Sequence, residues 1–260
     1  MFTPVITWFG YSAALILTLE VGYRSCHWIR TRRHLPGEEG SAFVMSSALT
    51  LLALLVAFTF GMAHSNFELR RDLVTAEATS ISTTHLRQQL LDNPQRDRLN
   101  ALMQDYVRVR MQFSTDRADP AALQSVRVQT AQLQSAIWEV TEQALDTPIG
   151  ARISVPLLNA TNEMFDDAER RYAAFDARIP QRILRSVHVF ALGSALLVGL
   201  TLAAGGSRHF ISTSGLFILV GLALSLISDL DNGATGQITT SQAPMERVAQ
   251  ALAMERPPPR

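Results

Sequence analysis

Residues 41–63, SAFVMSSALTLLALLVAFTFGMA, decide the fold of this chain, because the segment contains no charged residue. A helix needs about 20 apolar residues to cross a bilayer core about 30 Å thick, so the segment predicts a membrane-spanning helix. Three further segments meet the same criterion, and they cover residues 1–19, 186–207 and 210–228. The sequence therefore predicts a multi-pass membrane protein with four spans.

The first span also has a competing interpretation as a cleavable signal peptide. It lacks a basic start and a small-residue cleavage site, so a retained helix is the preferred interpretation. Arginines between the first two spans favour a cytoplasmic loop there, but arginines also flank the other span ends. The side of the membrane that the central region faces therefore stays open.

Charge and cysteine content exclude several classes of protein. The formal net charge is zero, so nothing indicates a nucleic-acid partner. The single cysteine, Cys26, excludes an intrachain disulfide and a cysteine metal cluster. The sequence contains no glycine-rich phosphate loop, no H-E-x-x-H motif and no nucleophile elbow, so we expect that the protein is not an enzyme.

The polar region between the second and third spans carries apolar residues at intervals of three and four, which is typical of amphipathic helices. Four helices are predicted, of which the first continues from the second span as far as Pro94. Another begins at Asp119–Pro120, where the missing N–H of proline costs nothing. Packed as an antiparallel bundle, these helices would bury their apolar stripes. No strand pattern competes, so the fold class is an all-α membrane protein with a helical extramembrane bundle.

The expected domains follow from the spans. They are the first two transmembrane helices at 1–65, the helical extramembrane domain at 66–180, the last two transmembrane helices at 181–230 and a C-terminal tail at 231–260.

Two polar patterns are candidates for function. Asp229 and Asp231 lie in a turn with Asn232 and Gly233, where their oxygens could coordinate a hard cation; solvated acids at a helix end are the alternative. The run 75–87 is rich in threonine and serine, which are mediocre helix formers. Such small hydroxyl side chains either let helices approach closely or line an aqueous path.

Several of these residues resemble the signature of the bacterial bestrophin-like domain family. The first similarity joins LLALLVAFTF at 51–60 to six motif residues, Phe67, Arg70, Arg71, Glu77, Leu86 and Arg87. The second joins Asp229-Leu230-Asp231 to Gly236 and Ile238, and resembles the family's D-L-D-R-P-x-x-G-x-I. The chain departs from the family pattern at Thr79, Ser82, His85, Asn232 and Gly233.

The resemblance implies kinship to bestrophins, which are pentameric anion channels whose second transmembrane helix lines the pore and narrows it at a hydrophobic neck. It therefore implies a homo-oligomeric channel in the bacterial inner membrane, with small inorganic ions and the lipid bilayer as its other partners. The implied pore-lining residues are Thr50, Leu54, Phe58, Gly61 and His64. Thr50, Leu54 and Phe58, four residues apart, would share one face as a neck that gates by dewetting.

The resemblance also implies a cation clasp at Asp229 and Asp231, with calcium as a candidate ion. A membrane-anchored sensor or scaffold, whose helical domain binds a ligand or partner, is the alternative function.

Overall fold

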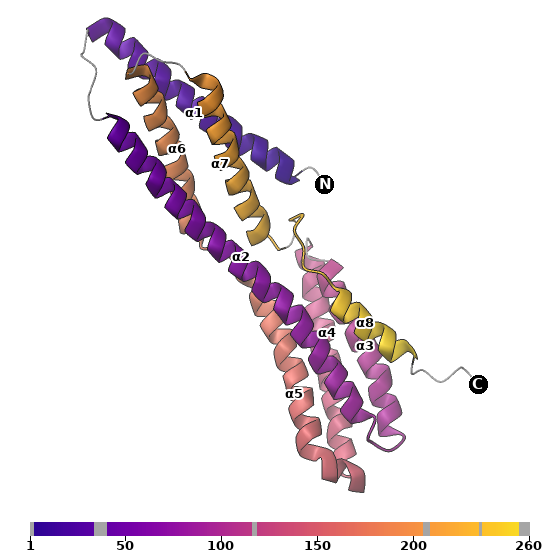
Figure 1. Cartoon of the computed structure of the whole chain (residues 1–260). Coiled ribbons are helices and arrows are strands. Elements are labelled where there is room, and N and C mark those ends of the chain that lie inside the picture. The colour runs from indigo at the N-terminus through magenta and orange to yellow at the C-terminus, as the bar shows by residue number, and fades with distance from the viewer. Residues whose placement is uncertain (1–2, 34–40, 116–118, 205–208, 234–235, 255–260) are drawn as a thin grey trace. The chain divides into compact units, whose positions relative to one another are not determined.

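The computed structural model describes residues 3–33, 41–115, 119–204, 209–233 and 236–254 (Figure 1). Helices account for nearly all of these residues, and no strand occurs in the described ranges, which confirms the all-α class. The helices are α1 (Thr3–Arg33), α2 (Ser41–Gln88), α3 (Gln95–Thr115), α4 (Pro120–Leu145), α5 (Pro148–Asp176), α6 (Gln181–Ala204), α7 (Phe210–Asp231) and α8 (Ala243–Met254). Residues 34–40, which join the first two spans, lie outside the described residues.

Four segments of the described chain are long and apolar enough to cross a membrane. They are Val5–Cys26, Phe43–Gln88, Pro148–Ala204 and Phe210–Asp231. Each predicted span overlaps one of them. The long second and third segments also include polar helix beyond the spans, because α2 continues past residue 63 and α5 precedes α6.

The described chain forms two compact units. The membrane unit contains Met1–Asn66, Arg178–Asn232 and Gly236–Ile238, and thus α1, α6, α7 and the first part of α2. The helical unit contains Phe67–Ala177, Gly233–Thr235 and Thr239–Arg260, and thus the remainder of α2, α3 to α5 and α8.

The core of the membrane unit joins side chains from all four of its helices. Its buried members are Leu15, Leu19, Leu52, Val187, Ala191, Ala195, Val198, Phe217 and Leu224. Two glycines let the backbones of α1 and α6 approach closely. A Cβ atom added at Gly22 would lie 2.4 Å from the carbonyl oxygen of Leu196, and one at Gly199 would lie 2.1 Å from that of Leu19. Small residues at such crossings permit the van der Waals packing that holds helices together in lipid.

Replacing Gly199 with alanine is expected to destabilise the membrane unit by about 1–3 kcal/mol, the usual cost of overpacking. The new methyl group would press on the backbone of α1, which cannot move aside as a flexible side chain would. Gly193, in the same helix, is the matched control, because an added Cβ there meets nothing within 4 Å. Thermal unfolding of the detergent-solubilised variants measures the difference. Equal unfolding temperatures for the two alanine variants would contradict the prediction.

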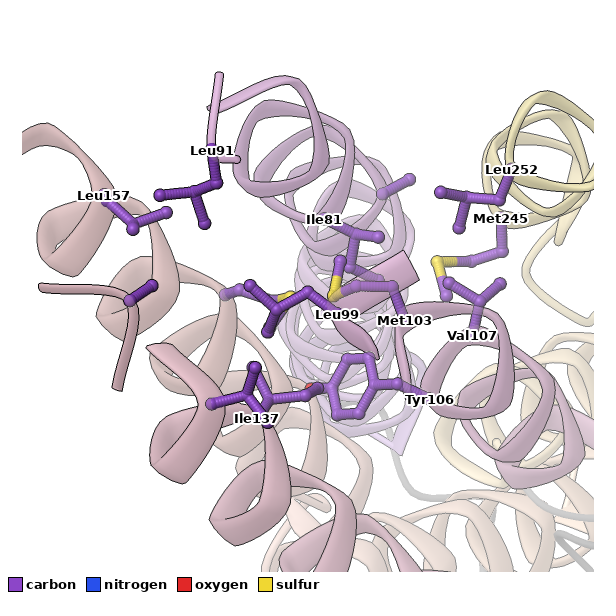
Figure 2. Close-up of a cluster of buried hydrophobic side chains, with 14 of the residues drawn as sticks. Ile81, Leu91, Leu99, Met103, Tyr106, Val107, Ile137, Leu157, Met245 and Leu252 are labelled. Atoms are coloured by element: carbon purple, nitrogen blue, oxygen red, sulfur yellow. The ribbon is translucent and has the colours of Figure 1, made fainter. Parts of the chain in front are cut away.

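The core of the helical unit draws on α2, α3, α4, α5 and α8 (Figure 2). Ile81 from α2 lies among Leu99 and Met103 from α3, and Ile137 from α4 lies near Tyr106. A second cluster joins α3, α4 and α5 through Val109, Phe113, Val126, Tyr172 and Phe175. The predicted apolar stripes of the extramembrane helices are thus buried against one another.

Helix α8 lies in the segment that the sequence predicted as a tail. Its Met245 and Leu252 are buried in the core of the helical unit, where they contact the side chains of α3 (Figure 2). A helix this short is marginal in isolation and depends on such packing for its stability. The formation of α8 therefore depends on its packing against other helices, which its own sequence does not predict.

Candidate functional site

One side of α2 in the membrane unit is left without packing partners in the single chain. Thr50, Leu54, Phe58, Gly61 and His64 are all exposed, and spacings of three and four residues place them on one side of the helix. The side chains of Leu54 and Phe58 are 52% and 66% exposed. The structure thus brings the five predicted pore-lining residues onto one face, and their role in a pore stays a prediction.

This helix is also the least packed of the four apolar segments. Only 11% of its apolar window is buried, against 22%, 39% and 28% for the windows of the other three in chain order. The buried residues of this part of α2 are Leu52, Thr59 and Ala63, and Met45, Leu49, Leu55 and Val56 pack in part against the core of the membrane unit. The rest of the helix is available to lipid or to another copy of the chain.

In the helical unit, the hydroxyl run of α2 divides between two environments. Ser80 and Thr84 are buried, and the Thr84 hydroxyl donates to the Ala160 carbonyl of α5 at 2.9 Å. Thr75 and Thr79 are exposed, and they border a groove of about 750 Å³ between α2 and α5. A smaller groove of about 330 Å³ lies between α2 and α8 and shares both threonines. Close packing and solvent contact, which the sequence left as alternatives, thus apply to different residues of the run.

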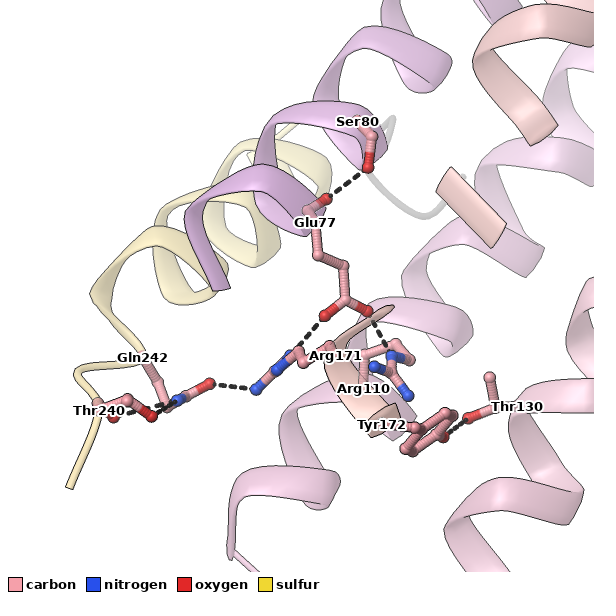
Figure 3. Close-up of polar contacts among 8 residues, drawn as sticks. All are labelled: Glu77, Ser80, Arg110, Thr130, Arg171, Tyr172, Thr240 and Gln242. Carbon is pink, nitrogen blue, oxygen red and sulfur yellow. Dashed lines mark hydrogen bonds and ion pairs between the residues drawn. The ribbon is translucent and has the colours of Figure 1, made fainter. Parts of the chain in front are cut away.

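A buried ionic network connects α2 to the other helices of this unit (Figure 3). The Glu77 carboxylate accepts hydrogen bonds from Arg110 of α3 and from Arg171 of α5, the latter at 2.6 Å. Arg171 also donates to the Gln242 side chain at 2.7 Å, which ties in the segment before α8. All three charged side chains are at most 3% exposed.

The aromatic side chain of Tyr172 extends this network (Figure 3), and Phe113 packs beside it. The guanidinium carbon of Arg110 lies 4.4 Å from the ring centroid of Tyr172 and 5.2 Å from that of Phe113. The Tyr172 hydroxyl donates to the Thr130 hydroxyl of α4 at 3.0 Å. Glu77 of α2 therefore binds α3 and α5 directly, and Tyr172 connects this network to α4.

The pKa values in the network follow from burial and pairing. Burial alone would raise the pKa of Glu77, but the two arginines outweigh it and hold the pKa below the ordinary 4.5. Burial would lower the pKa of Arg110, and its contact with Glu77 raises it instead. Burial and the neighbouring Arg110 lower the pKa of Arg171. Glu77 is therefore an ionised carboxylate that lies between the positively charged Arg110 and Arg171.

Sequence reasoning identified Glu77 as a motif residue but missed its two partners. A signal for one of them was present, because Arg110 follows Tyr106 by four residues and interrupts the apolar stripe of α3. A charge at a position that should face the core indicates a buried partner. Arg171 carries a weaker signal, since it neighbours the stripe residue Tyr172.

The other motif residues have separate structural positions. Arg70 is buried and donates to the carbonyl oxygens of Ala174 and Ala177, at 3.2 and 3.1 Å, so it satisfies acceptors left open where α5 ends. Arg71 is exposed and pairs with Glu68 at 2.8 Å. The remaining three do not join a common site: Phe67 is half-buried, Leu86 is exposed, and Arg87 donates to the carbonyl oxygen of Pro156.

Asp229 and Asp231 bind backbone groups in this structure. The Asp229 carboxylate accepts from the backbone N–H groups of Gln237 and Ile238, at 2.8 and 3.0 Å. The Asp231 carboxylate accepts from that of Ile179 at 2.8 Å. Residues two apart on a helix do not face each other, so each carboxylate serves a different segment.

These contacts give Asp229 and Asp231 a structural role, which is the binding of backbone N–H groups, in addition to the predicted binding of a cation. No group of three or more His, Cys, Asp or Glu side chains that could hold a metal ion occurs within the described ranges. The calcium site at this turn stays a prediction.

The fold and these sites define a helical membrane protein, with four apolar helices and a polar helical unit. A family model for the bestrophin-like domain matches residues 13–245, and the chain belongs to this family. The family and the fold indicate a function of the ion-channel kind.

Two solved structures have a similar fold, and both are crystal structures of a bacterial bestrophin homolog from Klebsiella pneumoniae. The one with a tyrosine-to-alanine mutation has a TM-score of 0.71 and 13% identity, covering 95% of this chain and 97% of that one. The one with a tryptophan-to-alanine mutation has a TM-score of 0.68 and 14% identity, covering 96% and 97%. The comparison with curated proteins found no match.

Proposed function

We propose that this protein is an anion channel of the bacterial inner membrane, in which several copies of α2 surround the ion path. The observation that carries the proposal is the open face of α2. A helix with only 11% of its apolar window buried lacks the partners that the other spans have. A ring of identical chains would supply them, because each α2 would contact its neighbours around a central axis.

A lipid-facing surface is the competing interpretation of this face. A face that only contacts lipid is expected to be apolar throughout, because lipid offers no hydrogen-bond partners. Here the bulky apolar residues Leu54 and Phe58 lie between Thr50, whose hydroxyl donates to the Ser46 carbonyl, and the imidazole of His64, all on one side of the helix. A narrow apolar section with more polar positions on either side is the pattern of a hydrophobic constriction in a water-filled path.

The polar part of α2 supports the same proposal. Thr75 and Thr79 are exposed beyond the apolar section and carry no charge, and the two acids on the same side before them, Glu68 and Asp72, pair with Arg71. The preference for anions and the number of five copies follow from the resemblance to bestrophins.

The lone cysteine allows a direct test by cysteine scanning. In a Cys26→Ser background, cysteines replace Thr50, Phe58 or Gly61, and chloride flux is measured in liposomes before and after a charged thiol reagent. Flux is expected to fall at these three positions, because the reagent would occupy the ion path. Phe60→Cys is the matched control, since this side chain is exposed but lies about 80–160° around the helix from the three tested positions.

Two results would overturn the proposal. One is an absence of chloride flux from correctly folded, reconstituted protein. The other is a mass in detergent that corresponds to one or two chains, because neither can enclose a central path with α2.

The alternative function, a membrane-anchored sensor or scaffold, has one observation in its favour. The groove of about 750 Å³ between α2 and α5 has the volume of a small-molecule site. Protein that carries no chloride flux but is stabilised by a small molecule, with the stabilisation lost on changing Asn159 in the groove, would favour the sensor.

A further inference from the structure

The buried network of the helical unit carries an uncompensated charge. Glu77 is the carboxylate that pairs with both Arg110 and Arg171, so one negative charge faces two positive charges. Arg110 is completely buried. Buried charges in proteins are normally paired, because removing an ion from water without a partner is costly. The cluster therefore carries one net positive charge, which a single anion would balance.

The hydrogen-bonding groups around Arg110 are also unbalanced, because they include more donors than acceptors. Among the described residues, the buried nitrogens Nη1 and Nη2 of Arg110 have no hydrogen-bond partner, and the Tyr106 hydroxyl and Gln134 Nε2 have none beyond their interaction with one another. Both arginine nitrogens and the amide nitrogen can only donate, and the tyrosine hydroxyl can donate as well. What the region lacks is an acceptor.

These donors lie near one another. Tyr106 and Arg110 are four residues apart on α3 and so share one side of that helix. Burial raises the pKa of Tyr106, while the charge of Arg110 and a hydrogen bond with Gln134 act to lower it, so the guanidinium and the amide of α4 lie near the phenol. The donors thus converge from two helices inside one core.

We propose that this cluster binds a small monovalent anion, with chloride as the physiological candidate. Arg110 would contribute charge and two N–H donors, and Tyr106 and Gln134 would complete the coordination. The anion would balance the second arginine and supply the missing acceptor at once. The site lies in the helical unit and involves none of the predicted pore-lining residues, so it is separate from the proposed ion path.

Water and the neighbouring aromatic rings would each meet only part of what Arg110 lacks. A buried water molecule would accept hydrogen bonds from the same donors, but it would leave the positive charge unbalanced. The rings of Tyr172 and Phe113 attract the Arg110 guanidinium, but an aromatic face compensates a buried cation less than an anion does. Only an anion would both balance the second positive charge and accept hydrogen bonds from the unpartnered donors.

The test measures thermal unfolding of the full-length protein in detergent as chloride replaces gluconate at constant ionic strength. Gluconate is too large for an enclosed site. We expect a saturable rise of about 2–4 °C once chloride exceeds its Kd about fivefold, because a ligand that binds only the folded state stabilises it. Bromide should give the same rise and an anomalous peak within hydrogen-bonding distance of Arg110 in crystals.

The variants Tyr106→Phe and Gln134→Leu remove donors and leave the Glu77 pairs intact. Combined, they should weaken the chloride effect about tenfold or more, whereas Gln129→Leu on the exposed side of α4 should leave it unchanged. An unfolding temperature that does not respond to chloride, or a response that persists in the double variant, would overturn the proposal. Neither readout depends on flux, so the anion site and the channel are tested separately.

Discussion

Replacing Glu77 with glutamine is expected to lower the free energy of unfolding by about 3–5 kcal/mol, the usual cost of removing one partner from a buried ion pair. The substitution keeps the shape of the side chain but leaves Arg110 and Arg171 in the core without a carboxylate. Chemical unfolding of the purified protein, followed by loss of helical circular dichroism, measures the change.

The matched control is Glu68→Gln on the same helix. Glu68 pairs with Arg71 at the surface, where both side chains are partly exposed, so its loss should cost at most about 1 kcal/mol. Replacing Glu77, Arg110 and Arg171 together with methionine should recover much of the stability, because a packed apolar core avoids the desolvation cost. Equal effects of the Glu77 and Glu68 variants would contradict the central role of the network.

The pH dependence of stability provides a second measure of how much the Glu77 carboxylate contributes to the free energy of unfolding. Because the pKa of folded Glu77 lies below its ordinary value of 4.5, the folded state releases this proton more readily than the unfolded state does. The stabilisation is therefore complete above pH 4.5 and is lost as the pH falls through the lower, folded pKa. The stability difference between the wild type and the Glu77→Gln variant should shrink over that acidic range. A constant difference would show that the carboxylate charge is not responsible.

Truncating the predicted neck is expected to have the largest effect on activity. The double variant Leu54→Ala and Phe58→Ala should raise chloride flux in liposomes about tenfold, which corresponds to a barrier lower by about 1.4 kcal/mol. A hydrophobic constriction blocks ions by excluding water, and smaller side chains widen it and let it hydrate. Both residues are exposed in the single chain, so their truncation should cost little stability within the protomer.

Phe60→Ala is the control for the neck, because Phe60 is also exposed but lies about 120° and 160° around α2 from Leu54 and Phe58. Its flux should match that of the unchanged protein. Size-exclusion chromatography should first establish that each variant forms the same oligomer. An unchanged flux in an intact double variant would remove Leu54 and Phe58 from the ion path.

The sequence also located the motif residues, but it did not show how they act. Arg70 and Glu77 belong to one motif of the family and lie on one helix. The structure gives them different functions, because Arg70 binds carbonyl oxygens where α5 ends, whereas Glu77 pairs with two arginines in the core. Which contacts each side chain makes depends on its angular position on α2 and on the helices that pack there.

The four apolar segments and the all-α class followed from the sequence alone. A helix satisfies its backbone hydrogen bonds within one segment, so the length and hydrophobicity of that segment predict a span without knowledge of its neighbours. The open face of α2 followed in part, since spacing along one helix determines which residues share a side.

Only the tertiary structure decided the buried network, the close crossing at Gly199 and the helix at 243–254. Glu77 meets partners 33 and 94 residues away in the chain, and α8 is held by a core that other helices form. Residues 41–63 could be interpreted from the sequence because lipid acts on each segment separately. The contacts of Glu77 could not, because they depend on how several helices pack at once.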